Sequence, residues 1–365
     1  MRDEAGGPGS LARGIIRNLN GYVPGEQPSE TDWIKLNTNE NPFPPSPRVE
    51  EAIREALPNL ARYPNPTSRL ARAAVARDSG LTEERVLVGN GSDDVLNLIF
   101  RAFTGPEASA GALEPSYSLY PILAGIQGTP FERVAIPESL EFPLQAIAEG
   151  GSRVFFLTSP NAPLGIGFSN AEIRSLAEHY EGLLVIDEAY GAFASESAVS
   201  LLEHFPRLVV TRSFSKSHSL AGLRIGYVLG HPEVIDELDK VRDSYNVDTL
   251  AQAGLVAALS DPDYYRATIG KVKNIRNYYL GWFRKLGWDT FASEANFITT
   301  RPTTRTGARG PGIAESCFEF LKRKKILVRH FPKSPLVADY LRITVGDEDQ
   351  MEALETALEL WLESV

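Results

Sequence analysis

The sequence predicts an α/β fold: a mainly parallel sheet covered by helices, followed by a smaller α+β domain. Short runs that are apolar on both faces are typical of parallel strands buried under helices. Such runs, bounded by turn residues, occur at 85–89, 153–157, 183–186 and 208–210. Helical patterns such as 93–103 and 171–180 lie between them. They supply the crossovers that parallel strands require.

The last third of the chain predicts the smaller domain. Apolar residues at helical spacing over 267–286, ended by Gly287, predict a long helix that connects the two domains. A helix, two strands and a closing amphipathic helix follow, at 313–324, 326–329, 340–344 and from Met351 to Leu362. Residues 300–312, rich in Thr, Gly and Arg, predict a loop.

Length and composition favour two domains and an arm. The chain has 365 residues, of which 43% are apolar, more than one typical domain needs. Residues 1–35 hold several Gly and Pro and predict an arm that leans on another part of the molecule. We therefore expect a large domain over 36–250 and a small domain over 251–365.

Charge and cysteine content exclude several classes of protein. The net charge is -10, with acids and bases interspersed and one short basic stretch at 322–325, which argues against nucleic-acid partners. Cys317, the single cysteine, fits a reducing cytoplasm, and the five scattered histidines predict no metal site. Neither a signal pattern nor a run of about 18 apolar residues occurs, so we expect no membrane segment and a cytoplasmic location.

The first chemical motif is a lysine in a serine-rich loop. Lys216 follows the apolar run 208–210, and Arg224 comes eight residues later. A lysine forms imines only as the free amine, so its site must lower its pKa. The arginine and the hydroxyls of Ser213 and Ser215 would hold a phosphate. Taken alone, a solvated loop lysine is the simpler interpretation.

The second motif is a carboxylate at a strand end. Asp187 directly follows four apolar residues, which places it where open α/β sheets build their sites. There it could pair with a protonated pyridine nitrogen and make that ring an electron sink. Tyr190 is placed to hydrogen-bond the phenolic oxygen of the same ring. A helix cap is an equally good account of Asp187 alone.

The third motif is a glycine turn before a helix. Gly91, Ser92 and Asp93 open the helix after the run 85–89, so free backbone N–H groups would face an anion. Asp94 stands where a dinucleotide-binding fingerprint has its third glycine. This argues against NAD binding and leaves phosphate binding as the functional interpretation of the motif. An ordinary capped helix start is the alternative.

In this order the motifs resemble those of fold-type I PLP-dependent aminotransferases, most closely the histidinol-phosphate aminotransferases, over residues 20–365. The motifs are Gly-Asn-Gly-Ser-Asp at 89–93, Ser-Pro-Asn-Ala-Pro-Leu-Gly at 159–165, Asp-Glu-Ala-Tyr at 187–190, Ser-Phe-Ser-Lys at 213–216 and Ala-Gly-Leu-Arg at 221–224. Stretches at 36–42, 62–64, 115–120, 244–247, 295–297 and 340–346 add to the resemblance. It implies a seven-stranded sheet with helices on both faces.

The resemblance also implies roles for these residues around pyridoxal 5'-phosphate (PLP). Lys216 would hold the cofactor as a Schiff base and move the α-proton, while Asp187 and Tyr190 would contact the ring nitrogen and ring oxygen. The phosphate would be bound by the turn of Gly91, Ser92 and Asp93 and by Ser213, Ser215 and Arg224. Tyr117 would stack on the ring, although a core tyrosine is the plain alternative. Tyr63 would reach the phosphate of the neighbouring subunit, which implies a homodimer on which the arm also packs.

One motif departs from the family pattern. The family usually has asparagine directly before the proline at 163, where it contacts the ring oxygen, but this chain has Ala162 there. Two hypotheses stay open: Asn161 replaces it after a small backbone shift, or Tyr190 acts alone.

Substrate anions are expected at two arginines. Arg342 lies in the apolar strand 340–344, where an unpaired charge is costly, so an anionic partner is expected. The resemblance gives it the α-carboxylate of glutamate and the phosphate of histidinol phosphate in turn, with Arg329 as a second anion-binding arginine and Tyr22 as a further hydroxyl. A surface salt bridge and a loop tyrosine are the alternatives for those two. His218 is expected to support the lysine from behind.

The predicted reaction is transamination of L-histidinol phosphate and 2-oxoglutarate to imidazole-acetol phosphate and L-glutamate, in histidine biosynthesis. An aromatic amino acid aminotransferase or a threonine-phosphate decarboxylase would keep every cofactor residue and change only the pocket. A non-catalytic regulator of the same fold, or a nucleotide-binding protein, is the alternative from another class. It would need a DNA-binding domain or the missing glycine, and 35 residues are too few for such a domain.

Overall fold

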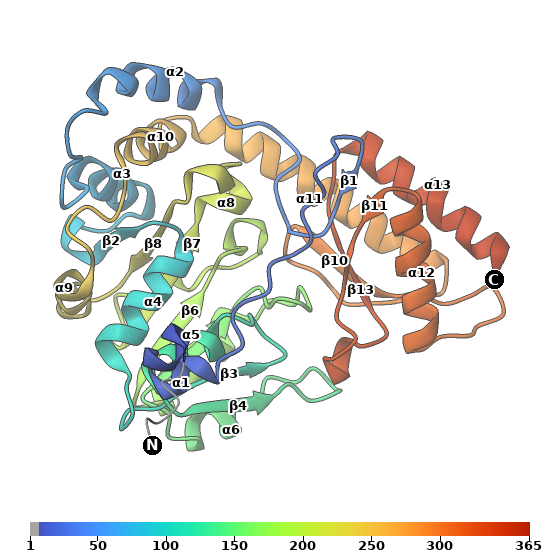
Figure 1. Cartoon of the computed structure of the whole chain (residues 1–365), viewed down its shortest axis with the longest axis horizontal. Helices are drawn as coiled ribbons and strands as arrows, with labels where there is room; N and C mark the ends of the chain where they lie inside the picture. The colour runs from blue at the N-terminus through green and yellow to red at the C-terminus, as the bar shows by residue number, and fades with distance from the viewer. Residues whose placement is uncertain (1–6) are drawn as a thin grey trace.

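The computed structural model describes residues 7–365. A seven-stranded sheet forms the centre of the larger domain (Figure 1), with strand order β2-β8-β7-β6-β5-β3-β4. The strands are β2 (Val86–Gly89), β3 (Ala110–Glu114), β4 (Phe131–Ala135), β5 (Val154–Thr158), β6 (Leu183–Asp187), β7 (Leu208–Ser213) and β8 (Gly226–Leu229). β8 runs antiparallel to both of its neighbours, and the other pairs are parallel. The predicted mainly parallel sheet is confirmed.

Helices cover both faces of this sheet, as the runs that are apolar on both faces predict. Alternate residues of β5 show the division, because Phe155 belongs to one hydrophobic cluster and Phe156 to another. The first cluster includes α3 (Arg69–Ser79), α6 (Leu144–Glu149), α7 (Asn170–His179) and α10 (Thr249–Leu259), with α2 (Pro47–Ala56) packed outside α10. The second includes α4 (Ser92–Phe103), α5 (Tyr120–Gln127) and α9 (Pro232–Val241).

A smaller α+β domain follows the long helix α11 (Pro262–Lys285). Its four-stranded antiparallel sheet has the order β12-β13-β10-β9. The elements are β9 (Asp289–Thr290), β10 (Phe297–Arg301), α12 (Pro311–Arg323), β12 (Arg329–His330), β13 (Leu341–Thr344) and α13 (Glu348–Ser364). Cys317 lies buried in α12, and Trp361 of α13 is fully buried in the same core.

Two predicted boundaries of this domain are wrong. The expected strand 326–329 is two short strands, because β11 (Ile326–Leu327) pairs in parallel with β1 (Ile34–Lys35), whereas β12 pairs with β13. The expected loop 300–312 begins later, because Thr300 and Arg301 continue β10, where Thr300 pairs with Leu341. The consecutive β-branched residues Ile298, Thr299 and Thr300 favour a strand, so the abundance of Thr did not indicate a loop there.

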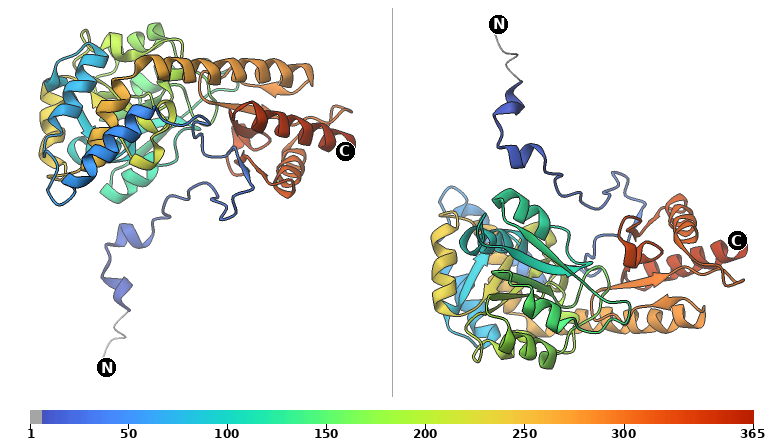
Figure 2. Two further views of the ribbon diagram at one scale, coloured as in Figure 1. Left: turned by 90° about the horizontal axis from the view of Figure 1, so that it is seen from above. Right: turned by 90° about the horizontal axis from the view of Figure 1, so that it is seen from below.

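The described part of the arm, residues 7–35, runs along the outside of the molecule (Figure 2). Helix α1 (Gly14–Arg17) lies against α5, where Arg13 donates a hydrogen bond to the carbonyl of Ile126. Further along, Glu26 and Asp32 pair with Lys322 and Lys325 of the smaller domain. The division at residues 35 and 250 stays a prediction. Within residues 7–365, no helix combines the length and apolar character that a membrane span needs.

Candidate active site

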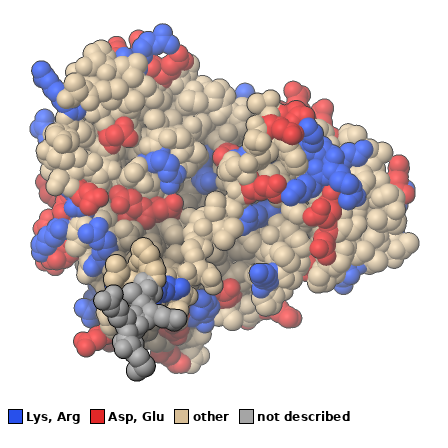
Figure 3. All heavy atoms as spheres, in the orientation of Figure 1, with Lys and Arg blue, Asp and Glu red and all other residues tan. Residues whose placement is uncertain are grey.

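A cavity of about 390 Å³ lies where the carboxyl ends of β5, β6 and β7 face the smaller domain. On the face that Figure 3 shows, acidic and basic side chains are interspersed and a hollow lies between the two parts of the molecule. Residues from distant parts of the chain line the cavity, among them Thr158, Asp187, Ser213 and Arg342. A crevice at the carboxyl ends of parallel strands is where such sheets bind their ligands.

Asp187 ends β6 and is buried at the floor of the cavity. Its carboxylate accepts hydrogen bonds from the Tyr120 hydroxyl at 2.6 Å, the Thr211 hydroxyl at 3.2 Å and the Ala189 amide at 3.2 Å. Burial raises the pKa of Asp187, and the hydrogen bonds oppose that shift. A protonated ring nitrogen beside it would favour the carboxylate form further.

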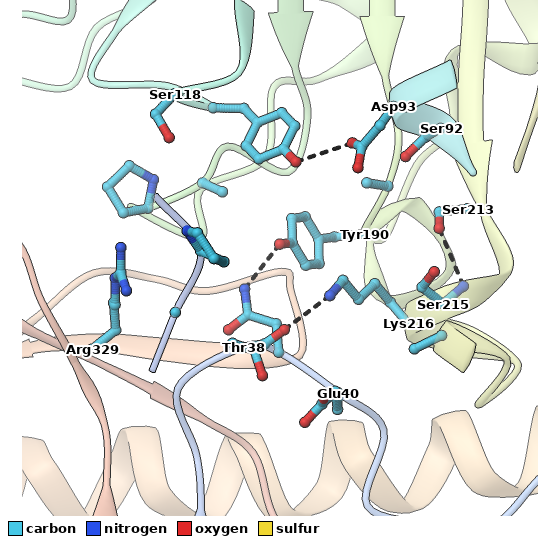
Figure 4. A pocket seen from close by; sticks show the side chains of 18 of the residues that line it. Thr38, Glu40, Ser92, Asp93, Ser118, Tyr190, Ser213, Ser215, Lys216 and Arg329 are labelled. Atoms are coloured by element: carbon cyan, nitrogen blue, oxygen red, sulfur yellow. Dashed lines mark hydrogen bonds between the residues drawn. The ribbon is translucent and has the colours of Figure 1, made fainter. Parts of the chain in front are cut away.

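Lys216 reaches the same cavity from α8 (Phe214–Ser217), the short helix after β7. Its Nζ donates a hydrogen bond to the Thr38 carbonyl at 2.9 Å (Figure 4). Burial, with the positive charge of Arg342 as the next cause, lowers the pKa of Lys216 from 10.5 to about 8. The amine is therefore closer to its nucleophilic form at neutral pH than a surface lysine is.

A cradle for an anion lies beside these two residues. Ser92 and Asp93 at the start of α4, Ser213, Ser215 and Arg224 all line the cavity. Gly91 has φ +88°, a left-handed conformation that favours glycine, and a Cβ there would lie 2.8 Å from Nη2 of Arg224, whose guanidinium would have to shift. Free amides at a helix start, hydroxyls and a guanidinium are the groups that hold a phosphate.

Tyrosines form one side of the cavity. Tyr117 lines it and donates a hydrogen bond to Asp93 at 3.0 Å, while its ring meets Tyr22 edge-on at 6.1 Å. Tyr120, the first residue of α5, is fully buried and stacks on Phe156 with ring centroids 4.9 Å apart. The aromatic face of Tyr117 is thus held between polar and aromatic neighbours and is available to a flat ring.

Together these groups fit the cofactor that the resemblance implies. The cavity offers an amine of lowered pKa for an aldehyde, a buried carboxylate for a ring nitrogen and a cradle for a phosphate. Lys216, Asp187, Tyr190, Tyr117 and Arg224 are all brought together as predicted, although their individual roles stay predictions.

Two arginines line the opposite side. Arg329 and Arg342 are direct cross-strand partners on β12 and β13. Two like charges in this arrangement repel each other unless an anion lies between them. Arg342 contacts the rings of Phe297 and Phe331, and burial lowers its pKa. Tyr22 of the arm also lines the cavity, so all three predicted substrate residues face it.

Of the residues predicted to bind the cofactor, Gly91, Asn161 and Tyr63 do not line the cavity. The side chain of Asn161 is buried and bonded to the chain, donating to the Pro115 carbonyl at 3.2 Å and accepting from the Leu164 amide at 3.3 Å. Tyr63 is 81% exposed and stacks on Tyr245 on the outer surface. His218 lies behind Lys216, bonded to Ser217 at 2.7 Å, and burial lowers its pKa to about 3.

Sequence reasoning missed the segment 37–39, which lines the cavity with three consecutive residues. This stretch contributes to the family resemblance, which implies no role for it. The signal was its run of polar residues within 36–42, which ends up buried: Asn37 and Asn39 are each 1% exposed. Tyr120, the last residue of the stretch 115–120, likewise has no role that the resemblance implies.

Comparisons with known proteins agree with this geometry. The family model for class I and II aminotransferases matches residues 31–358. Histidinol-phosphate aminotransferase from Geotalea daltonii is 46% identical over 348 residues, 94% of this chain and 97% of its own length. The protein of the same name from Citrifermentans bemidjiense is 44% identical over 345 residues, 94% of this chain and 96% of its own. The crystal structure of histidinol-phosphate aminotransferase from Sinorhizobium meliloti in complex with pyridoxal 5'-phosphate superimposes with a TM-score of 0.88 at 26% identity, covering 97% of this chain and 98% of that one.

Proposed function

We propose that this chain, which belongs to the class I and II aminotransferase family and within it to the histidinol-phosphate aminotransferases, transaminates L-histidinol phosphate with 2-oxoglutarate. The products are imidazole-acetol phosphate and L-glutamate, in a step of histidine biosynthesis. The observation that carries the proposal is that Lys216 and Asp187 meet in one cavity between an anion cradle and a pair of arginines.

PLP is the cofactor that this site fits. When bound, it draws electrons from the substrate's α-carbon, so that the α-proton becomes acidic. Lys216 would hold the cofactor through Nζ and then, as the free amine, take the α-proton and return it. Asp187 would keep the ring nitrogen protonated, and the α4 start with Arg224 would hold the phosphate.

Arg342 and Arg329 would orient the substrates by their anionic groups. The α-carboxylate of glutamate and the phosphate of histidinol phosphate enter in alternate half-reactions, so one pair of arginines serves both in turn. Among residues 7–365, the guanidinium of Arg342 makes one hydrogen bond, from Nη2 to the Asn37 carbonyl at 2.9 Å. The rest of its fork is available to a carboxylate or a phosphate ester.

The direct test is a substrate panel on the purified protein with PLP. We expect 2-oxoglutarate-dependent conversion of L-histidinol phosphate to exceed that of aromatic amino acids. Failure to turn over L-histidinol phosphate would reject the substrate, and carbon dioxide release from threonine phosphate would indicate the decarboxylase. Borohydride reduction followed by peptide mapping tests the cofactor separately, with Lys216 as the expected labelled residue.

We also propose that the chain acts as a homodimer in which Tyr63 completes the partner's site. Tyr63 and Tyr245 form a stacked pair on the surface, with ring centroids 4.5 Å apart. Exposed leucines at Leu60 and Leu70 lie close in sequence, an apolar surface that fits a second copy. Mixing an inactive Tyr63→Ala protein with an inactive Lys216→Ala protein should restore activity, because the hybrid contains one intact site. Two monomeric species in sedimentation, or no rescue, would contradict the shared site.

A further inference from the structure

Three consecutive residues, Asn37, Thr38 and Asn39, hold three side chains that come from three other elements. The Asn37 carbonyl accepts from Arg342, and the Thr38 carbonyl accepts from Lys216, each at 2.9 Å. The third contact is made by a side chain, because Nδ2 of Asn39 donates to the Tyr190 hydroxyl at 2.9 Å. This segment therefore sets the reactive groups of the cavity relative to one another.

The orientation of the Asn39 amide is fixed by its other hydrogen bonds. The Asn39 backbone amide donates to the Thr344 hydroxyl at 2.9 Å, and that hydroxyl donates to Asn39 Oδ1 at 3.2 Å. With Oδ1 held by Thr344, the Nδ2 end faces Tyr190. Asn296 holds the Asn39 carbonyl at 2.9 Å, and φ of +55° keeps the residue in the left-handed region, which asparagine tolerates well.

This arrangement decides what the Tyr190 hydroxyl can do. A phenol has one proton to donate, and here its oxygen already accepts from Asn39. Within residues 7–365, no hydrogen bond is made by the Tyr190 hydroxyl as donor, and Tyr190 lines the cavity. Its proton is therefore free for an acceptor in the cavity. Arg342 and Asp187 are the charged groups that act on this phenol.

The residue at position 162 makes the contact of a ring oxygen more dependent on the Tyr190 hydroxyl. Ala162 lines the cavity but carries no polar group, and the amide of Asn161 is bonded to Pro115 and Leu164. A ring oxygen at this place therefore meets the Tyr190 hydroxyl without help from an amide of the 159–165 loop. The strength of the hydrogen bond from the Tyr190 hydroxyl to that ring oxygen then depends on how the Tyr190 side chain is positioned.

We propose that Asn39 is a positioning residue that commits Tyr190 to donate its proton to the ring oxygen of the cofactor. The inference rests on the proposed function, because it assumes PLP in this cavity. By donating to the phenol oxygen, Asn39 makes Tyr190 a better donor and prevents its proton from turning toward the chain. Asn39 thereby compensates for the missing side-chain amide at position 162, which in the family pattern would also contact the ring oxygen.

The test uses the full chain loaded with PLP and the pH titration of its absorbance, which reports the protonation of the link between Lys216 and the cofactor. A weaker donor leaves more negative charge on the ring oxygen, so that link should keep its proton to higher pH. Tyr190→Phe should move the midpoint upward by about one pH unit, the worth of one hydrogen bond to a charged group. Asn39→Gly should move it in the same direction by about half as much and lower kcat/KM about threefold to tenfold.

Asn39→Gly keeps the left-handed backbone, which limits damage to folding. Asn39→Asp provides a second variant, because it keeps the size and the Thr344 contact while it replaces the donor with an acceptor. Asn296→Ala is the matched control: it removes a buried amide from the same segment without touching Tyr190. If Asn39 acts through Tyr190, the control should leave the midpoint in place.

A double-mutant cycle separates positioning from loosening of the segment. In the Tyr190→Phe background, Asn39→Gly should add almost no further shift, because its target is gone. An equal shift in both backgrounds, or a shift that Asn296→Ala reproduces, would overturn the inference. A wild-type protein that shows no titrating absorbance with PLP would instead reject the proposed function, so the two failures can be told apart.

Discussion

The two walls of the cavity differ in how fully their polar groups are bonded. On the sheet wall, formed by Thr158, Asp187, Ser213 and Lys216, the buried carboxylate accepts three hydrogen bonds from the chain. On the arginine wall, formed by segment 37–39, Arg329 and Arg342, several buried atoms have no partner within residues 7–365. They are Oδ1 of Asn37, Oγ1 of Thr38 and Nε of Arg342.

Buried polar atoms without partners are rare in folded proteins, and several at one place indicate a ligand. The contrast therefore distinguishes the wall that would bind the cofactor from the wall that would bind the substrates. The sheet wall is built for a resident group whose contacts are set in advance. Under the proposed function, the unpaired Nε of Arg342 and the two like charges of this wall would meet the substrate anions of the two half-reactions, whereas Oδ1 of Asn37 can only accept a hydrogen bond from a donor group of the ligand.

The largest effect is expected where both walls depend on one atom. Lys216→Ala removes the amine that holds the cofactor and moves the proton, so kcat should fall by about 10⁴-fold, the upper end for a lost proton-transfer group. Steady-state kinetics and borohydride labelling measure both roles. Lys240→Ala, in an exposed ion pair on α9, is the control and should leave both unchanged. Labelling that persists in the Lys216→Ala protein would show that another lysine holds the cofactor.

A change on the arginine wall should affect substrates and spare the cofactor. Arg342→Lys keeps the charge but loses the planar fork, so kcat/KM should fall about 30-fold to 100-fold, the worth of a charge-assisted hydrogen bond. The affinity for PLP, measured by fluorescence titration, should remain that of the wild type. Loss of PLP affinity in this variant would remove the distinction between the walls.

Much of the sheet wall could be predicted from sequence, and the reason is local. Asp187 and Lys216 each follow a run that is apolar on both faces, and the structure has strands there within a few residues of the prediction. The order strand, then carboxylate or lysine, places a side chain at a known edge of the sheet. The chemistry of this wall is thus encoded within single stretches of chain.

The arginine wall could be predicted only in part, because its contacts join residues far apart in the chain. Arg342 was found from its charge in an apolar strand, but its partner, the Asn37 carbonyl, lies 305 residues away. Backbone carbonyls carry no residue signature, so the role of segment 37–39 could not be read from side-chain type. Asn161 shows the converse, since its position in a motif predicts a contact with the cofactor ring, whereas in the structure its side chain is bonded to Pro115 and Leu164.

The rate at which Lys216 reacts with PLP should depend on pH in a way that reflects its buried environment. Because burial lowers the pKa of Lys216 to about 8, the reactive free amine appears with rising pH around that value and not around 10.5. The rate at which the cofactor-free protein captures PLP, followed by absorbance, should therefore rise about tenfold between pH 7 and pH 9. A midpoint near 10.5 would mean that the arginine wall and burial leave this amine unperturbed.

The smallest effect is expected from a residue that only supports the sheet wall. Tyr120 lies between the Thr158 hydroxyl at 2.7 Å and the Asp187 carboxylate at 2.6 Å. A carboxylate only accepts, so Tyr120 donates to Asp187 and receives the proton of Thr158. Tyr120→Phe removes one of three bonds to Asp187, which should raise the pKa of that carboxyl and weaken PLP binding about fivefold.

Tyr180→Phe is the matched control for this substitution. Its hydroxyl is also bonded, to the Ser152 carbonyl at 2.5 Å, in the same domain but away from the cavity lining. Both variants lose a phenolic hydrogen bond, so both should lower the midpoint of thermal unfolding. Only Tyr120→Phe should change PLP affinity, because only its hydroxyl reaches the carboxylate that faces the ring. Equal losses of PLP affinity would mean that the bonds around Asp187 stabilise the fold without tuning the site.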